Sequence, residues 1–307
     1  MNASRIAVVG SYATGLTMKV ERIPCAGETL LGTGYRVDFG GKGSNQAVGC
    51  ARLGAHVDFV AKIGKDSFGE MALGLYRDEG IGTANVTQSA DAPTGVGFIV
   101  VEATSGQNCI VLDPGANELL TPADVSAATL ALQSAAVVLT QLEIPVEAAE
   151  AALSLGRMAG AVTILNPAPV RPLPASLLEL VDVLTPNETE ARVLAGLTAT
   201  SSVDPQTVAQ QLIRQGVKQV VMTLGERGAL LVNGASCTHI PAISVQAVDT
   251  TGAGDAFNGA LAAALAEGRT LEIAVRRAVA AGGLATTRVG ARAGMPAAAE
   301  LEAALRD

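Results

Sequence analysis

The segment Val248–Gly259, VDTTGAGDAFNG, combines glycines and small residues with one acid, directly before an apolar stretch. Gly252 and Gly254 let the backbone bend closely around a ligand. A helix predicted to begin near Gly254 would point its free N–H groups, with those around Ala253, at a bound anion. Asp255 would repel that anion but is suited to taking a proton from an attacking hydroxyl. The segment therefore predicts phosphoryl transfer, with these four residues as the catalytic ones.

The structural alternative is a glycine-rich turn in which Asp255 is only a helix N-cap. A second segment, Phe39–Ala47 (FGGKGSNQA), has two glycines before a lysine, which is reminiscent of a nucleotide loop. The spacing of its glycine, lysine and Ser/Thr residues is not that of a Walker A motif. A glycine turn leading into a helix is its alternative interpretation.

Taken with their neighbours, both segments resemble signatures of the ribokinase-like, or phosphofructokinase B-type, carbohydrate kinases. The run DTTGAGDAFNGAL, which begins at Asp249, resembles the C-terminal signature, and Phe39–Ala47 resembles the N-terminal one. The resemblance implies that Gly41, Lys42 and Asn45 contact a sugar, together with the base Asp255.

Further likeness extends over roughly residues 4–296. Glu143 follows a predicted strand, where the family has a sugar-contacting glutamate; alone, it would be a solvated charge. Asn166–Pro169 matches a loop over the active site. Thr185–Glu190 matches a nucleotide segment that also contacts magnesium through water, and Thr223–Gly228 matches one that lines ATP. The implied ATP contacts are Asn187, Thr223, Gly225, Gly228 and Gly254, and the implied magnesium contact is Glu190.

Asn187 with Glu190 also has the pattern of a capping-type helix start, and both interpretations can hold together. The family's cofactors follow from the resemblance. ATP would bind as its Mg²⁺ complex, since the ion offsets charge on the transferred group. K⁺ would lie beside the anion hole, held mostly by backbone carbonyls. Its implied ligands are Asp249, Thr251, Ala285, Arg288, Gly290 and Gly294.

The sequence departs from the family where the first strand ends. Ribokinases proper have Gly-Ser-x-Asn-x-Asp there, whereas this chain has Gly10–Gly15 (GSYATG), so Ala13 and Gly15 replace the sugar-binding Asn and Asp. A charge-assisted hydrogen bond contributes roughly 1.5–3 kcal/mol, so ribose should bind less well. The predicted acceptor is a primary hydroxyl of a pentose-like sugar, ribose by family default. A deoxy sugar, a nucleoside or another polyol is the alternative.

Two other classes of function stay open at this point. A non-catalytic sugar- or nucleotide-sensing protein would explain the lost sugar contacts, but not the retained Asp255 and anion hole. An NAD-linked oxidoreductase would need GxGxxG directly after the first strand, and Gly10–Gly15 does not supply it.

Strands and helices alternate along the chain, which predicts an α/β fold with an open, mostly parallel, Rossmann-like sheet covered on both faces. Ligands in such sheets bind beyond the carboxyl ends of the strands. The predicted strands are Ile6–Gly10, Val57–Ile63, Ala136–Gln141, Val162–Asn166, Val181–Thr185, Gln219–Leu224 and Ala229–Val232. The predicted helices are Ser44–Leu53, Asp66–Glu79, Pro145–Ala159, Glu188–Ala195, Pro205–Gln215, Gly254–Glu267 and Leu271–Thr287.

Two stretches interrupt this alternation, at about residues 15–40 and 95–112. Their predicted strands are Thr17–Val20, Glu28–Leu31, Tyr35–Phe39, Val96–Val101 and Asn108–Leu112, the last two joined as a hairpin. We expect them to form one small sheet inserted in a single domain spanning 1–307. The resemblance implies that this sheet is a lid that pairs between two subunits of a homodimer.

Composition limits the partners and the compartment. The net charge is −8 and no Lys/Arg run occurs, which argues against nucleic acid. Hydrophobic residues make up 49% of the chain, but no apolar run is long enough to span a membrane, and the N-terminus lacks a signal-peptide pattern. The four cysteines have no metal-type spacing and are expected to be reduced thiols. These features predict a cytoplasmic protein.

Overall fold

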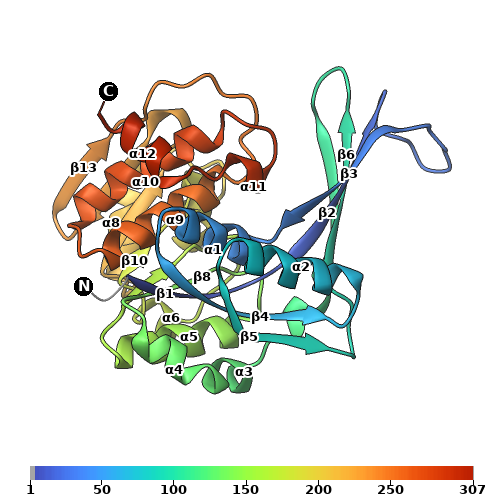
Figure 1. Ribbon diagram of the computed structural model, residues 1–307. Coiled ribbons are helices and arrows are strands. Elements are labelled where there is room, and N and C mark those ends of the chain that lie inside the picture. Colours follow the sequence, from blue (N-terminus) through green and yellow to red (C-terminus); the bar gives the residue numbers. More distant parts are fainter. Residues whose placement is uncertain (1–3, 307) are drawn as a thin grey trace.

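The computed structural model describes residues 4–306, and a nine-stranded sheet runs through its centre (Figure 1). The strand order is β13-β12-β11-β10-β9-β8-β1-β4-β5. Neighbouring strands are parallel from β11 to β5, while β12 and β13 run antiparallel at one edge. The strands are β1 Arg5–Val9, β4 His56–Gly64, β5 Gly82–Ser89, β8 Val137–Thr140, β9 Val162–Leu165, β10 Val183–Leu184, β11 Gln219–Thr223, β12 Ala229–Asn233 and β13 Ser236–Ile240.

Strand β1 shows why the centre of the sheet consists of continuous apolar runs. Ile6 and Val8 belong to the core on one face, and Ala7 and Val9 belong to the core on the other. All four side chains are fully buried. Since successive residues of a strand point to opposite faces, a strand covered on both sides must be apolar at every position.

Helices cover both faces of the sheet (Figure 1). One face packs against α1 Lys42–Arg52, α2 Ser67–Asp78, α9 Ala253–Ala266, α10 Leu271–Ala285 and α12 Ala298–Ala304. The other packs against α3 Pro122–Ala127, α4 Thr129–Ser134, α5 Val146–Met158, α6 Ala175–Leu178, α7 Glu188–Leu194 and α8 Pro205–Arg214. The short helix α11 Ala291–Gly294 lies next to α10 in the chain, and 3₁₀ turns occupy Gly115–Leu119 and Gly225–Arg227. Within residues 4–306, no helix is long and apolar enough to cross a membrane.

A second sheet of four strands projects from the body, as Figure 1 shows, and we call it the lid. Its order is β3-β2-β6-β7, with β2 Ala13–Val20, β3 Thr33–Gly40, β6 Gly95–Glu102 and β7 Asn108–Asp113. The predicted hairpin is confirmed as β6 and β7. The predicted strand Glu28–Leu31 is wrong. This stretch is a turn and irregular backbone, where Glu28 accepts a hydrogen bond from the Cys25 N–H and pairs with Arg22.

The predicted fold class is confirmed, and each predicted body strand and helix is present within a few residues of its expected bounds. Strand β5 was not predicted, because its sequence GTANVTQS is polar and lacks alternation. It lies at the sheet edge, where backbone pairing with β4 holds it as a strand although its side chains form no apolar face.

Candidate active site

The loop before α9 has the shape predicted for an anion hole. Gly252 precedes the helix with φ 80°, a left-handed conformation that favours glycine. No side chain caps α9, so its first turn leaves N–H groups for a ligand. The Ala253 N–H donates to the Thr250 carbonyl at 3.2 Å. A Cβ at Gly254 would meet nothing within 4 Å, so this side of the loop is open.

Asp255 lies in the first turn of α9 and is only 6% exposed. Its Oδ2 accepts a hydrogen bond from Asn45 Nδ2 at 2.9 Å, and its Oδ1 accepts one from Gln46 Nε2 at 3.0 Å. The helix-cap interpretation of Asp255 is therefore wrong, because Gly252 occupies the cap position and the carboxylate bonds to α1 instead.

Opposing influences act on the Asp255 carboxylate. Burial raises its pKa above the ordinary value, and the charge of Glu143 adds to that rise. The charge of Lys42 and the hydrogen bonds from Asn45 and Gln46 act in the other direction. A raised pKa makes a carboxylate a better proton acceptor, while the opposing groups favour the ionised form that a base requires.

Two glycines bring α1 close enough to make these contacts. Gly41 has φ 85°, and a Cβ on it would lie 2.6 Å from Tyr12 Cα. A Cβ on Gly43 would lie 2.5 Å from the backbone just after β1. The N-terminus of α1 therefore packs against the end of β1, and Asn45 and Gln46 reach Asp255 on α9.

Glu143 lies just beyond β8 and joins the same cluster. Its Oε2 accepts hydrogen bonds from the Ser11 hydroxyl at 2.6 Å and from the Lys42 backbone N–H at 2.8 Å. The interpretation of Glu143 as a freely solvated charge is therefore wrong. These bonds tie the ends of β1 and β8 to the start of α1, and they place a second carboxylate near Asp255.

An unpredicted amide chain orients the groups around Asp255. Gln46 Nε2 donates to both Asp255 Oδ1 and Asn166 Oδ1, each at 3.0 Å, and its Oε1 accepts from Gln141 Nε2 at 2.6 Å. An ionised carboxylate can only accept hydrogen bonds. Gln46 must therefore present its nitrogen to Asp255 and its oxygen to Gln141, so Gln141 fixes the orientation of Gln46.

The polar chain continues to the anion-hole loop. Asn166 Nδ2 donates to the Thr185 carbonyl at 3.1 Å, and the Thr185 hydroxyl donates to Asn258 Oδ1 at 2.6 Å. Asn258 Nδ2 then donates to the Gly254 carbonyl at 2.8 Å. The ends of β9 and β10 are thus connected to the backbone of the loop that precedes Asp255.

The residues implied for the nucleotide gather at the ends of β10 and β11. Asn187 and Thr223 form an isolated parallel bridge. Asn187 and Glu190 also form a reciprocal capping box, with both hydrogen bonds at 2.8 Å, so the capping interpretation is confirmed. Burial raises the pKa of Glu190, while the hydrogen bond from the Asn187 N–H and the charge of Lys42 act in the other direction.

The turn after β11 holds the other two implied nucleotide residues. Gly225 has φ 60° with open space where a Cβ would lie. A Cβ on Gly228 would lie 2.1 Å from the Ile240 carbonyl oxygen, so packing against β13 requires a glycine there. Both residues lie at the same edge of the sheet as the carboxyl ends of β8, β9 and β10.

Most residues implied as cation ligands come together beside the loop. Asp249 Oδ1 accepts from the Thr251 N–H at 2.9 Å, and Asp249 Oδ2 accepts from the Gly290 N–H at 2.8 Å. A Cβ on Gly294 would lie 2.6 Å from the Ala285 carbonyl oxygen, so only glycine allows this approach. The Gly294 N–H also donates to the Gly290 carbonyl at 3.0 Å, so these residues form one connected group.

Arg288, the sixth implied ligand residue, directs its side chain elsewhere. Its guanidinium pairs with Glu300 at the surface, so only its backbone remains for a cation. Within residues 4–306, no group of three or more His, Cys, Asp or Glu side chains forms a metal site. Of the cysteines, Cys50 is buried, which raises the pKa of its thiol to about 12 and makes it unreactive.

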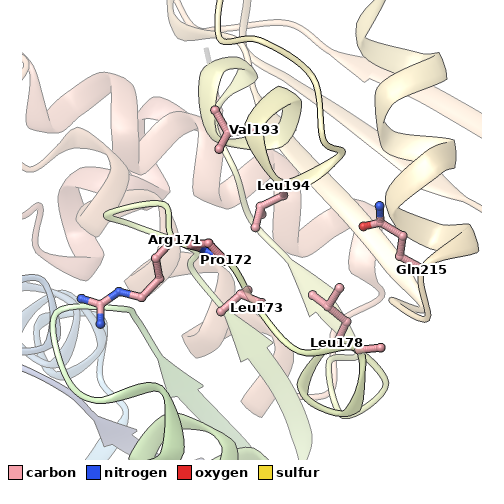
Figure 2. Close-up of a pocket in the computed structure, with 8 residues that line it drawn as sticks. Arg171, Pro172, Leu173, Leu178, Val193, Leu194 and Gln215 are labelled. Atoms are coloured by element: carbon pink, nitrogen blue, oxygen red, sulfur yellow. The ribbon is translucent and has the colours of Figure 1, made fainter.

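Figure 2 shows a separate pocket of about 410 Å³ around α6 and α7. Its lining is mostly apolar, and the Arg171 guanidinium points away from the leucines and donates to the Leu142 carbonyl at 2.5 Å. The lining residues are Arg171, Pro172, Leu173, Ala175, Leu178, Val193, Leu194 and Gln215. None of these side chains is a carboxylate or a histidine, so this pocket, unlike the Asp255 cluster, offers no general base.

Ser11, Gln46, Gln141 and Asn258 are the residues that sequence reasoning missed. The available signal was a polar residue within an otherwise buried helix or at the end of a buried strand, as for Gln46 in α1. Their partners lie far away in the chain, so no local spacing reveals them.

Comparison with known proteins agrees with this geometry. The sequence model of the pfkB family of carbohydrate kinases matches residues 3–298. The ribokinase of Haemophilus influenzae is 37% identical over 291 residues, covering 95% of each chain. A deoxyribokinase of Salmonella typhi is 35% identical over 292 residues, again covering 95% of each. A solved ribokinase from Arabidopsis thaliana, complexed with ribose and ATP, has a TM-score of 0.91 and 32% identity, covering 99% of each chain.

Proposed function

Because this chain belongs to the pfkB family of carbohydrate kinases and is a sugar kinase, we propose that it phosphorylates the primary hydroxyl of a pentose-like sugar. ATP is the phosphoryl donor in this family. The NAD-linked oxidoreductase alternative is wrong, since the family match covers nearly the whole chain. A buried, ionisable Asp255 beside the uncapped start of α9 is the observation that supports the proposal most.

Asp255 is the proposed general base. It takes the proton of the sugar hydroxyl as that oxygen attacks the γ-phosphorus, and the bond from phosphorus to the ADP oxygen breaks. Of the amides of residues 251–254, those of Thr251 and Ala253 already donate to Asp249 and Thr250. The amides of Gly252 and Gly254 are therefore proposed to stabilise the charge on the transferred group, together with Lys42. Gln46 and Asn45 hold the carboxylate in place through the bonds described above.

The proposed sugar contacts are Gly41, Lys42, Asn45 and Glu143. Asn45 and Glu143 are side chains already fixed by hydrogen bonds within the cluster. Ribose, a deoxyribose, a nucleoside or another polyol are the candidate acceptors, because Ala13 and Gly15 offer no polar contact. The similarity to both a ribokinase and a deoxyribokinase leaves a pentose as the preferred class.

The proposed nucleotide contacts are Asn187, Thr223, Gly225, Gly228 and Gly254, and Glu190 would hold Mg²⁺ through water. The residues fit, because Mg²⁺ is usually held by one or two carboxylates together with substrate phosphates, and no protein cage is needed. When bound, Mg²⁺ offsets the negative charge that develops on the phosphates. The connected group that contains Asp249, Ala285 and Gly294 is the proposed site of a monovalent cation such as K⁺.

We also propose that the protein is a cytoplasmic homodimer, one domain per chain, joined through the lid. One lid face is apolar and exposed: Tyr35, Phe98 and Val111 are 61%, 55% and 64% exposed. Such a patch is unusual on a monomer and typical of a protein interface. The lid's edge strand β7 is exposed along its whole length and can pair with a second copy.

A coupled assay of ADP release with Mg-ATP and K⁺ tests the function over a panel of pentoses, deoxy sugars, hexoses and nucleosides. We expect strong turnover with one pentose-like acceptor. Tight sugar binding without turnover over the whole panel would instead support the sugar-sensing alternative.

A further inference from the structure

One face of the lid carries two adjacent glycines beside a single acid. The strand register places Asp38, Gly15, Gly97 and Leu112 side by side in one row across β3, β2, β6 and β7, and we call this row the strip. A Cβ on Gly15 or Gly97 would meet nothing closer than 3.4 Å, and the Leu112 side chain would lie 3.8 Å from the one on Gly97. The strip therefore has room for a ligand at Gly15, and Asp38 is the acid at its side.

The distances around Gly15 confirm that these groups share one face. A Cβ on Gly15 would lie 3.4 Å from Ile99 Cδ1 and 3.7 Å from Asp38 Cβ. Both are ordinary van der Waals distances, so the position could hold a larger side chain without collision. Asp38 and Ile99 thus flank the strip from its two neighbouring strands.

Asp38 is held in place and still accessible. Arg36 Nε donates to Asp38 Oδ2 at 2.6 Å, along the same face of β3. The Asp38 side chain remains 41% exposed, so its other oxygen can accept hydrogen bonds from a ligand. An ionised carboxylate offers several acceptor positions, enough for sugar hydroxyls in addition to Arg36.

The strip adjoins the proposed sugar contacts. In the row next to it, Ala13 on β2 pairs with Gly40 on β3. Ser11, two residues before Ala13, and the Lys42 N–H, two residues after Gly40, both donate to Glu143. A sugar that contacts Glu143 and Lys42 would therefore lie beside the strip that holds Asp38.

We propose that Asp38, positioned by Arg36, binds ring hydroxyls of the acceptor sugar and selects a fully hydroxylated pentose over its deoxy analogue. The inference rests on the sugar site proposed above and names its substrate class. A site that accepts hydrogen bonds from a hydroxyl discriminates against the analogue lacking it, because the acceptor then loses that partner in the complex.

Kinetics of lid variants with D-ribose and 2-deoxy-D-ribose test the proposal. Asp38→Ala should raise the KM for ribose about 10–100-fold, the equivalent of one charged hydrogen bond, and weaken the preference for ribose over deoxyribose. The KM for ATP should not change. Glu102→Gln, which removes another lid carboxylate, is the matched control and should behave as wild type.

A variant that moves the acid from β3 to the neighbouring position on β2 provides a second test. Gly15→Asp alone places two carboxylates side by side, which is unfavourable. The double variant Gly15→Asp with Asp38→Ala returns one carboxylate to the strip and should recover most of the ribose affinity lost in Asp38→Ala. Recovery would show that the strip needs one acid rather than this particular ion pair.

Asn45→Ala separates failure of this inference from failure of the sugar site. If Asn45→Ala raises the ribose KM and Asp38→Ala does not, the sugar site stands and the role of Asp38 is overturned. If neither variant affects the ribose KM, or wild type turns over neither pentose, the proposed pentose site fails and the role of Asp38 fails with it.

Discussion

The catalytic body and the lid differ in how their side chains are held. Around Asp255, side-chain hydrogen bonds hold the amides of Asn45 and Gln46 against the carboxylate, and Gln141 and Asn166 bond to Gln46 in turn. The lid has few such bonds. It has two glycines beside Asp38 on one face, and it has exposed apolar side chains on both faces, such as Phe98 on one and Leu112 on the other. We therefore propose that the body carries out the reaction, while Asp38 on the lid contributes to the choice of sugar.

The largest expected effect is the loss of the base. Asp255→Asn should lower kcat by about 10²–10⁴-fold, because the variant cannot take up the sugar proton. Its melting temperature should stay close to that of the wild type, since asparagine retains the volume. Its oxygen can accept from Gln46, and its NH2 can donate to Asn45 once the Asn45 amide turns over. ADP release and thermal melting measure the two quantities.

Removing the amide that orients Asp255 should have a smaller effect. Gln46→Leu removes a hydrogen bond that lowers the pKa of Asp255, so that pKa rises further. The base must be ionised, so the acid limb of the kcat/KM profile should move to higher pH. Gln133→Leu, an exposed position on α4, is the control. If the acid limb of the kcat/KM profile stays at the same pH in Gln46→Leu, Gln46 does not position Asp255.

Glu143→Gln should move the same limb in the opposite direction. The charge of Glu143 raises the pKa of Asp255, so its removal lowers that pKa and the limb moves to lower pH. Glutamine keeps an oxygen for Ser11 and the Lys42 N–H, so the local fold should persist. A limb at unchanged or higher pH would show that the two carboxylates are not coupled. The pH profile of kcat/KM is measured as for Gln46→Leu.

On the lid, the exposed apolar face should affect assembly rather than chemistry. Phe98→Ser should shift the protein from dimer to monomer, because it removes an apolar side chain from the centre of the proposed contact. Leu130→Ser is the matched control, since Leu130 is 83% exposed but lies on α4 in the body. Light scattering after size exclusion measures the mass. A monomeric wild type would contradict the proposed dimer.

The smallest effect is expected where the lid joins the body. Asp66 caps α2 through the Gly69 N–H and also accepts hydrogen bonds from the Thr94 N–H and hydroxyl, directly before β6. Asp66→Ala should therefore cost about 2 kcal/mol in the free energy of unfolding. Asp204→Ala, which removes an exposed cap of α8, should cost less. Denaturant unfolding compares them.

The contribution of Asp66 to the free energy of unfolding should fall as the pH is lowered. Burial raises the pKa of Asp66, but the hydrogen bonds from Thr94 and Gly69 outweigh it, so the folded-state pKa is lowered. The contribution of Asp66 to stability is therefore present above its unfolded pKa of about 3.9 and is lost as the pH falls through the folded-state value. In Asp66→Ala, this loss of stability at low pH should be absent.

The sequence predicted the body of this molecule better than the contacts within it. Apolar strands and capped helices such as Asp66–Glu79 leave local patterns, and the glycines around Asp255 indicate a close backbone approach to a ligand. Gln46 and Gln141 gave no such signal, because their bond joins residues far apart in the chain and depends on the sheet order. Strand β5 was missed because its polar sequence forms a strand only when paired with β4.

The most direct test of the account is sugar binding by calorimetry in Asp255→Asn, measured beside its turnover. The account predicts that the variant still binds the sugar accepted by the wild type but transfers almost no phosphoryl group. Near wild-type turnover would show that Asp255 is not the base. Loss of sugar binding as severe as the loss of turnover would show that Asp255 acts mainly in binding.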